Sequence, residues 1–401
     1  MTIQRTALIG LLGLASLLTT VQQESGLWTL ALARPSPYRT VKPTEPAISA
    51  SRAILTEKDQ NVDVLVATRR NGRLDFFDVT SLELLGSFAI HHLAASVFAS
   101  PNGRTLYLQQ AATPDGNSCC ALFSLDLTTK VMCFMIQPSN LGVPTPDGLR
   151  IFTQRGNVGI EVFDAGTLVR LPTIQAPGNY RLSVSPDSRW LFGTTSWKGP
   201  SIDIFDLRSG KLARRHMLPK GSWPRGEWLG DKFYVHALDG GRSLLWTVTP
   251  EAETLGSPVE INLPNLPERR GPTLLELLVG GNHLFLFEMF GHKLDPRRSG
   301  ASVGGGVFVI NPSSGELISH VTPTIQFSRL AVSGAGRHLY GIDSGQLGWN
   351  GPVRLLKLDT ERGSILAQRT LDTDVWFIAA ARVPKPLVPR GVLDTSPCPT
   401  H

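Results

Sequence analysis

One motif recurs along most of this 401-residue chain: a short apolar strand whose last residue starts a turn. Aligned on that last residue, the copies end at Asp78, Asp126, Asp164, Asp206, Thr249, Asn311 and Asp359. The spacings are 48, 38, 42, 43, 62 and 48 residues, and the residue before each end is apolar. An Asp or Asn side chain at such a position bonds its own turn backbone and tolerates turn conformations. The repeat therefore divides the chain into seven similar units.

A second turn signal lies upstream in most units and marks the start of another strand. It is clearest at Ser100–Gly103, Thr145–Gly148, Ser185–Ser188 and Ser333–Gly336. Four short strands in a unit of about 40–45 residues is the period of a β-propeller blade. We therefore predict an all-β fold, a single seven-bladed β-propeller of four-stranded antiparallel blades that spans residues 47–383.

A ring of blades must be closed, because open sheet edges invite association with other chains. The apolar segment Val375–Val383 has no unit after it. We predict that this C-terminal segment forms the innermost strand of the first blade, with Ala47–Leu55 as the alternative. The tail, residues 384–401, contains five prolines and is predicted to be disordered.

The N-terminal residues 1–33 are typical of a secretory signal peptide. Arg5 precedes the apolar core Ala7–Leu18, and Ala31-Leu32-Ala33 has the small-x-small cleavage pattern. An uncleaved membrane anchor is the alternative, although the core is short for a span of about 20 residues. Residues 34–46 contain four prolines and are predicted to be an extended linker. We expect a periplasmic or secreted protein that has no membrane association after cleavage.

The composition argues for a globular chain and against a nucleic-acid partner. Charged residues make up 18% of the chain and hydrophobic residues 41%, which suits a core-forming protein. The net charge is +6, but no run of Lys and Arg carries interleaved aromatic residues. A basic run of that kind is the usual footprint of nucleic-acid binding.

The repeat resembles the YVTN-type repeat of bacterial extracytoplasmic propellers, and Val184–Arg215 and Gly306–Ile342 carry the pattern best. The sixth unit also has a proline-rich lead-in, Asn262–Pro272, and a long loop, Met289–Gly305. That layout is similar to the penultimate blade of the heavy chains of quinoprotein amine dehydrogenases such as methylamine dehydrogenase.

This resemblance implies a secreted propeller without a cofactor of its own that holds a small subunit bearing a tryptophan-derived quinone. Those heavy chains usually carry two half-cystines on neighbouring strands of a middle blade, whereas the unit around Trp223–Ala237 has no cysteine. On the resemblance we predict a non-catalytic scaffold for protein–protein binding, whose partner is another protein or a small subunit at the propeller rim.

The predicted binding residues lie in loops and connections between strands. Trp and Arg are preferred anchors at protein interfaces. The stretch Ser222–Trp228 holds two tryptophans, one arginine and one glutamate, and packing of one tryptophan between blades is its alternative interpretation. The predicted set is Trp223, Arg225, Trp228, His292, Arg297 and Trp349.

Three of the four cysteines lie close together in the second unit. Cys119 and Cys120 begin one strand, and Cys133 lies on the next strand of the same hairpin, opposite about Phe123. That register makes a Cys120–Cys133 disulfide too long without a bulge. A bulge in the hairpin would bring Cys120 and Cys133 close enough to bond, so the disulfide is kept as an alternative. No histidine lies at the spacing needed for a metal site.

The alternative function is a hydrolase of the lactonase type, with a small-molecule site at the mouth of the propeller channel. We find no nucleophile elbow, metal motif, phosphate loop or haem-attachment motif, and we assign no catalytic residue, metal or cofactor. His91 and His92 lie in an inter-blade connection without a third ligand nearby. Three or more acidic or histidine side chains meeting at the channel mouth favour the enzyme, and an apolar rim with Trp and Arg favours the scaffold.

Overall fold

The computed structural model divides the chain into two units, Met1–Leu55 and Thr56–His401. The described residues all belong to the second unit: 61–90, 94–110, 121–136, 142–155, 159–176, 178–196, 199–220, 222–239, 241–264, 275–288, 306–325, 327–343, 352–372 and 375–397. The predicted signal peptide, the linker and the alternative closing strand Ala47–Leu55 lie outside these residues.

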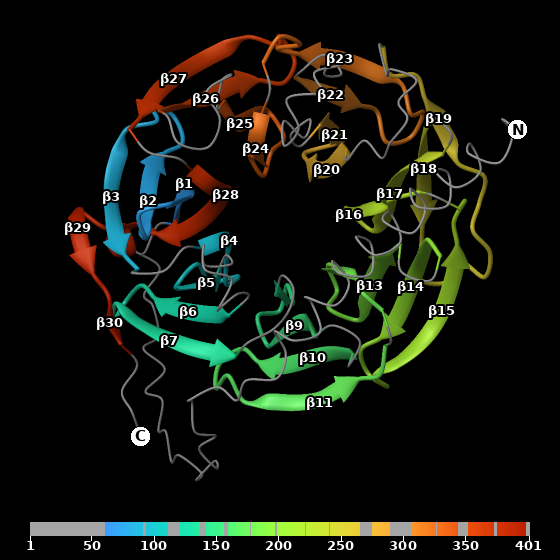
Figure 1. Cartoon of the computed structure of the whole chain (residues 1–401), viewed down its shortest axis with the longest axis horizontal. Helices are drawn as coiled ribbons and strands as arrows, with labels where there is room; N and C mark the ends of the chain where they lie inside the picture. The colour runs from blue at the N-terminus through green and yellow to red at the C-terminus, as the bar shows by residue number, and fades with distance from the viewer. Residues whose placement is uncertain are drawn as a thin grey trace, which may run out of the picture. The chain divides into compact units, whose positions relative to one another are not determined.

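The described strands form seven sheets, each with four antiparallel strands, arranged as the blades of a propeller, which confirms the predicted fold (Figure 1). Blade 1 contains β28 (Val375–Pro384), β1 (Asn61–Arg69), β2 (Arg73–Asp78) and β3 (Leu84–Ala89). Blade 2 contains β4 (Ala94–Ala99), β5 (Thr105–Gln110), β6 (Leu122–Asp126) and β7 (Val131–Ile136). Blade 3 contains β8 (Val143–Pro144), β9 (Arg150–Arg155), β10 (Gly159–Asp164) and β11 (Arg170–Ile174).

The remaining four blades follow the same order from the ring axis outward. Blade 4 contains β12 (Arg181–Val184), β13 (Trp190–Thr195), β14 (Ser201–Asp206) and β15 (Lys211–Met217). Blade 5 contains β16 (Arg225–Leu229), β17 (Lys232–Asp239), β18 (Arg242–Val248) and β19 (Val259–Ile261). Blade 6 contains β20 (Leu275–Gly280), β21 (His283–Glu288), β22 (Val307–Ile310) and β23 (Leu317–Val321). Blade 7 contains β24 (Phe327–Val332), β25 (His338–Asp343), β26 (Val353–Asp359) and β27 (Ile365–Leu371).

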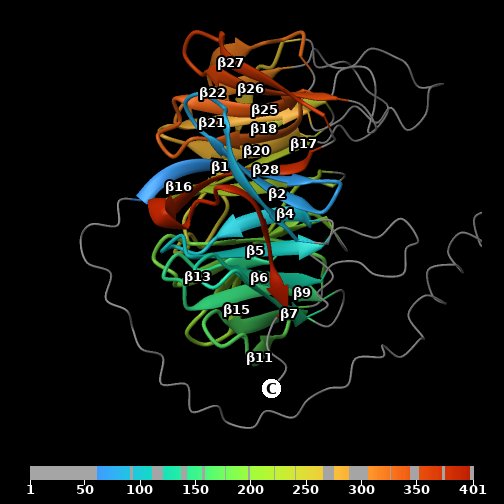
Figure 2. The same ribbon diagram turned by 90° about the vertical axis from the view of Figure 1, so that its left-hand side faces the viewer.

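The C-terminal strand closes the ring as predicted. β28 pairs antiparallel with β1, and Val62 lies opposite Val383 in the register. Figure 2 shows β28 beside β1, with β4 of the next blade alongside. The first and last parts of the ring therefore share one sheet, which removes the open edges of a linear stack.

The prediction that the tail is disordered was wrong for residues 384–397. After a short 3₁₀ turn at Lys385–Leu387, β29 (Gly391–Asp394) pairs parallel with β3, and β30 (Ser396–Pro397) pairs parallel with β7 (Figure 1). Outer strands leave a row of backbone N–H and C=O groups unpaired. The tail pairs with some of these backbone groups on blades 1 and 2. Those hydrogen bonds order the tail in spite of its five prolines.

The recurring Asp or Asn at the strand ends acts as the sequence predicted. Asp164 Oδ1 accepts hydrogen bonds from the backbone N–H groups of Gly166 and Thr167, at 3.0 and 2.7 Å. The same pattern holds at Asp78, Asp126, Asp206, Asn311 and Asp359. The N–H donors lower the pKa of Asp164 against the opposing effect of burial. Each turn is thus fixed locally by its own first residue.

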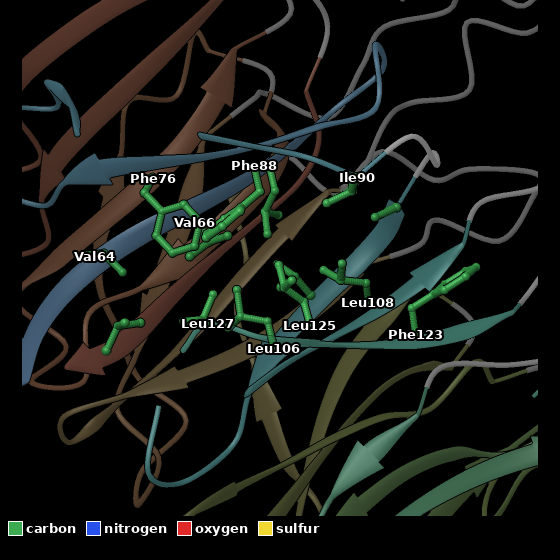
Figure 3. Packing of buried hydrophobic residues seen from close by; sticks show 14 of the residues in the cluster. Val64, Val66, Phe76, Phe88, Ile90, Leu106, Leu108, Phe123, Leu125 and Leu127 are labelled. Carbon is green, nitrogen blue, oxygen red and sulfur yellow. The ribbon is translucent and has the colours of Figure 1, made fainter. Parts of the chain in front are cut away.

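The core lies between blades. Among the described residues, each pair of neighbouring blades encloses one cluster of buried apolar side chains. Figure 3 shows the cluster between blades 1 and 2, where Phe76 meets Phe88 edge to face and Leu106 and Leu125 pack nearby. A blade buries both faces only when it has two neighbours, so the ring is stable as a whole rather than blade by blade.

Candidate functional site

Buried polar side chains recur at one end of the propeller, and we call it the polar end. In each blade the innermost strand pairs with the second strand, and the first residues of the innermost strand lie opposite the last residues of the second strand. The polar residues at those second-strand positions are Arg69, Gln109, Thr194, His236 and Asp343, and all five are buried. Buried polar groups are costly unless they are paired, so their recurrence at one end needs local partners.

Three blades meet at the polar end through one carboxylate. Arg181 of β12 donates two hydrogen bonds to Glu276 of β20, at 2.5 and 3.0 Å. Arg225 of β16 donates a third from its Nε, at 3.3 Å. The side chains of Arg225 and Glu276 are each 12% exposed, whereas that of Arg181 is 46% exposed. Arg181 is therefore the cation of this group that solvent or a ligand reaches most easily.

Glu227 belongs to the same group of charges. It lies two residues after Arg225 on β16, so the two side chains project from the same face of the sheet. The structure gives the Glu227 carboxyl no hydrogen bond within its described part. We call Arg181, Arg225, Glu227 and Glu276 the axial cluster.

The electrostatics of the axial cluster separate its two carboxyl groups. Burial raises the pKa of Glu227 to about 7, because the nearby Arg181 offsets only part of the cost and Glu276 adds repulsion. Burial also acts on Glu276, but Arg181 and Arg225 outweigh it and hold the pKa of Glu276 below its ordinary value. Glu276 therefore stays ionised, while Glu227 exchanges its proton near neutral pH.

His236 supports the cluster from the next strand. It lies opposite Arg225 in the β16–β17 register, and its Nε2 is 2.8 Å from the Ser243 hydroxyl. Burial, together with the charge of Arg225, lowers the pKa of His236 to about 3. The imidazole is therefore neutral at physiological pH and adds a hydrogen-bonding group without adding charge.

The predicted site residues fall into three groups. Arg225 is part of the axial cluster, and Trp223, two residues earlier, is 46% exposed. Trp228 instead points to the other face of β16, where its ring packs against Phe192 and Phe233 at centroid distances of 4.8 and 5.3 Å. His292, Arg297 and Trp349 lie outside the described residues. Only Arg225 and Trp223 are thus described at the predicted interface.

Cys133 is disulfide-bonded, and the predicted partner, Cys120, lies outside the described residues. Cys133 lies opposite Ser124 rather than Phe123, because the turn pairs Asp126 with Val131 and the register continues from there. Within the residues that the structure describes, no group of three His, Cys, Asp or Glu side chains is arranged to hold a metal ion. In that same part of the chain, no helix has the length and apolarity needed to cross a membrane.

Sequence reasoning missed Arg181 and Glu276. A usable signal was present for Arg181: it precedes the strand end Asp206 by 25 residues, and Arg225 precedes Thr249 by 24. Arginines at equivalent places in consecutive repeats lie on equivalent strands. Glu276 occupies the equivalent position in the sixth unit. Because that unit is longer, Glu276 precedes its strand end, Asn311, by 35 residues, and the spacing no longer matches.

Comparison with known proteins supports the fold. No protein-family model matches this chain, and no match is found among curated proteins. Dihydro-heme d1 dehydrogenase NirN in complex with DHE is 14% identical, with a TM-score of 0.52 over 86% of this chain and 83% of that one. A functionally unknown protein from Desulfotomaculum acetoxidans is 15% identical, with a TM-score of 0.51 over 78% of this chain and 99% of that one. Kuenenia stuttgartiensis hydrazine synthase is 15% identical, with a TM-score of 0.50 over 70% and 86%.

These identities show a shared fold alone. The chain is a seven-bladed β-propeller, and its solved relatives in fold have different names and activities. Propellers host many unrelated functions, so the function must be argued from the site. The predicted likeness to YVTN-type repeats and to amine dehydrogenase heavy chains has no matching family model and stays a prediction.

Proposed function

We propose that this propeller binds a small molecule bearing an oxyanion, a carboxylate or a phosphate, at its polar end. The observation that carries the proposal is Glu227. Its carboxyl is buried near Arg181 and Glu276, has no hydrogen bond from the described residues and has a pKa of about 7. An ionisable group perturbed by burial next to specific charges is a marker of functional sites.

The charge of the axial cluster supports an anionic ligand. Arg181 and Arg225 contribute two positive charges and Glu276 one negative charge, so the cluster carries a net charge of +1 when Glu227 is protonated. Arginine recognises planar oxyanions through paired N–H groups. Glu276 accepts hydrogen bonds from two N–H groups of Arg181. The Arg181 side chain is 46% exposed, and its other N–H groups remain for a ligand. A protonated Glu227 adds one more hydrogen-bond donor.

The same observation favours a second form of this function, a hydrolase of the lactonase type. A general acid–base group works best when its pKa is near the working pH, and Glu227 meets that condition. Opening of a lactone produces a hydroxy acid, whose carboxylate matches Arg181 and Arg225. Two acidic side chains, Glu227 and Glu276, and one histidine, His236, lie at the polar end, which supports the enzyme rather than the scaffold.

The protein-binding scaffold remains a second candidate because of Trp223. A large apolar side chain that is 46% exposed, two residues from the largely buried Arg225, is typical of an interface anchor. Secretion is proposed as well: disulfides persist in oxidising compartments, and Cys133 is in a disulfide.

Calorimetric titration tests the small-molecule proposal. Malate, succinate, glucuronate and inorganic phosphate are titrated into the wild-type protein and into Arg181→Ala and Glu227→Gln. The control is Arg208→Ala, which removes an exposed arginine from the β14–β15 turn at the opposite end of blade 4. We expect binding by the wild type and the control, and a loss of at least about tenfold in Arg181→Ala, since charge-assisted hydrogen bonds contribute about 1.5–3 kcal/mol.

Two results separate the alternatives. Hydrolysis of γ-butyrolactone by the wild type and its loss in Glu227→Gln would establish the enzyme. If none of the four oxyanions binds and Trp223→Ala abolishes capture of a stoichiometric protein partner, the scaffold is correct and the small-molecule proposal is wrong.

A further inference from the structure

We propose that Cys133 pairs with Cys398, and that this disulfide fastens the C-terminal tail to blade 2. Cys133 is disulfide-bonded, and the chain offers it three partners: Cys119, Cys120 and Cys398. The register of the two strands beside Cys133 discriminates among them.

The parallel pairing of the tail points directly to Cys398. Ser396 lies opposite Val131, and Pro397 lies opposite Met132. The next residue in each segment of the sequence is a cysteine: Cys133 follows Met132 in β7, and Cys398, which lies outside the described residues, follows Pro397. Neighbouring strands are about 4.7–4.9 Å apart, which falls within the span of about 4.4–6.8 Å between the Cα atoms of a disulfide. Residues opposite one another also project to the same face of a sheet.

The antiparallel side of β7 disfavours Cys120. Cys133 lies opposite Ser124, and Ala121 lies three residues further along β6, so their Cα atoms are about 11 Å apart. The carbonyl of Ala121 accepts a hydrogen bond from Gln110, so the chain there still runs away from Cys133. One Cα step of about 3.8 Å leaves Cys120 at least about 7 Å from Cys133, beyond the reach of a disulfide. Cys119 falls in the same tryptic peptide as Cys120, so one peptide-mapping experiment tests both.

The bond forms by ordinary thiol–disulfide exchange. The two thiols of Cys133 and Cys398 lose two protons and two electrons, and one S–S bond forms between their sulfur atoms. A small-molecule or enzyme disulfide accepts the electrons and protons and is reduced to two thiols. Such oxidants are present in the compartments where disulfides persist, which agrees with the proposed secretion.

The consequence is that a covalent bond, in addition to hydrogen bonds, holds the ring closed. β28 joins the two ends of the propeller by hydrogen bonds, and the tail then crosses the outer edges of blades 1 and 2 (Figure 1). A bridge at Cys398 prevents the tail, and β28 with it, from leaving the sheet without breaking blade 2 as well. The disulfide would close a loop that runs from Cys133 to Cys398. Closing so long a loop lowers the conformational entropy of the unfolded chain and so stabilises the folded state.

Peptide mapping tests the pairing, because trypsin separates the three candidate partners. Cys119 and Cys120 fall in the peptide 105–130, Cys133 in 131–150 and Cys398 in 391–401. The full chain is purified without reductant, its free thiols are blocked with iodoacetamide, and the digest is analysed by mass spectrometry before and after reduction. We expect 131–150 joined to 391–401, with complete loss of that species on reduction. A species joining 131–150 to 105–130, or alkylated Cys133, would overturn the proposal.

A variant experiment gives an independent readout. In the folded protein, Cys398→Ser is expected to make Cys133 reactive towards a maleimide, with about one label gained per chain at that residue. The matched control Cys120→Ser is expected to leave Cys133 unlabelled. Labelling of Cys133 in the control rather than in Cys398→Ser contradicts the proposed pairing.

Discussion

Arg181 of blade 4 and Glu276 of blade 6 form a two-point ion pair although blade 5 stands between them. Arg225 of blade 5 joins the same carboxylate. Three consecutive blades are therefore linked at the polar end by a single side chain. Because that carboxylate is largely buried, the link contributes to the geometry of the axial cluster as well as to stability.

Glu276→Gln is expected to lower the free energy of unfolding by about 3 kcal/mol, because loss of one partner leaves a buried charge uncompensated. The charge left behind is Arg225, whose pKa burial already depresses. Urea unfolding measures the change. The control Asp239→Asn removes an exposed ion pair with Arg242, and we expect a loss below about 1 kcal/mol there. Equal losses in both variants would contradict a special role for Glu276.

Glu227→Gln is expected to change how stability depends on pH. The folded protein keeps a proton on Glu227 up to a pKa of about 7, whereas the ordinary value is 4.5. Between these values the folded state binds more protons than the unfolded chain, so this group lowers stability as pH rises. The variant is expected to match the wild type near pH 4 and to exceed it by up to about 3 kcal/mol at pH 8.

Denaturant unfolding at several pH values measures this difference, and Glu316→Gln, at an exposed glutamate, is the control. A difference between Glu227→Gln and the wild type that stays constant across the range would show that the carboxyl titrates at its ordinary pKa.

Tyr180→Phe is expected to cost about 1–2 kcal/mol, since it removes one hydrogen bond to a buried carboxylate. The Tyr180 hydroxyl donates to Asp203 Oδ2 at 2.6 Å, and Arg215 donates to the same oxygen. Burial and the bond to Asp203 raise the pKa of Tyr180. Tyr234→Phe is the matched control, because the structure gives that hydroxyl no hydrogen bond within the described residues. Thermal unfolding of both variants distinguishes the hydrogen bond from the loss of an oxygen atom.

Gly86→Val is expected to displace the tail. A Cβ atom at Gly86 would lie 2.2 Å from the carbonyl oxygen of Pro389, which is backbone and does not yield easily. The wild-type bond after Arg390 is expected to resist trypsin and to be cut readily in the variant. Gly256→Val, where an added Cβ meets nothing within 4 Å and the backbone is not left-handed, controls for the mutation itself. Unchanged cleavage in Gly86→Val would mean that the tail is held elsewhere.

The repeat and the closing strand could be predicted because both depend on local sequence. A turn is fixed by its own Asp, as at Asp164, and Val375–Val383 was an apolar segment with no unit after it. The order of the tail could not be predicted in this way. It depends on the unpaired outer edges of β3 and β7, which exist only after the blades have formed.

The axial cluster was predicted only at Arg225. Its partner Glu276 is 51 residues away in sequence, and Arg181 is 95 residues from Glu276. The packing of consecutive blades around the axis brings these side chains together, and the repeat position gave a signal only for the two arginines. Trp228 shows a further limit of sequence reasoning. Because side chains alternate along a strand, Trp228 and Arg225 must face opposite sides of β16, but the alternation does not tell which side packs against Phe192.

The measurement that tests the proposed site most directly is the pH dependence of oxyanion affinity in the wild type and in Glu227→Gln. The probe is glucuronate, because its single carboxylate stays ionised from pH 5.5 to pH 8.5 and any change in affinity comes from the protein. Ionisation of Glu227 places a negative charge beside the bound anion, so wild-type affinity is expected to fall by at least about tenfold from pH 5.5 to pH 8.5. The Glu227→Gln variant is expected to change by less than about twofold over this range. An equal fall in both proteins, or no binding by the wild type, would contradict a ligand site built around Glu227.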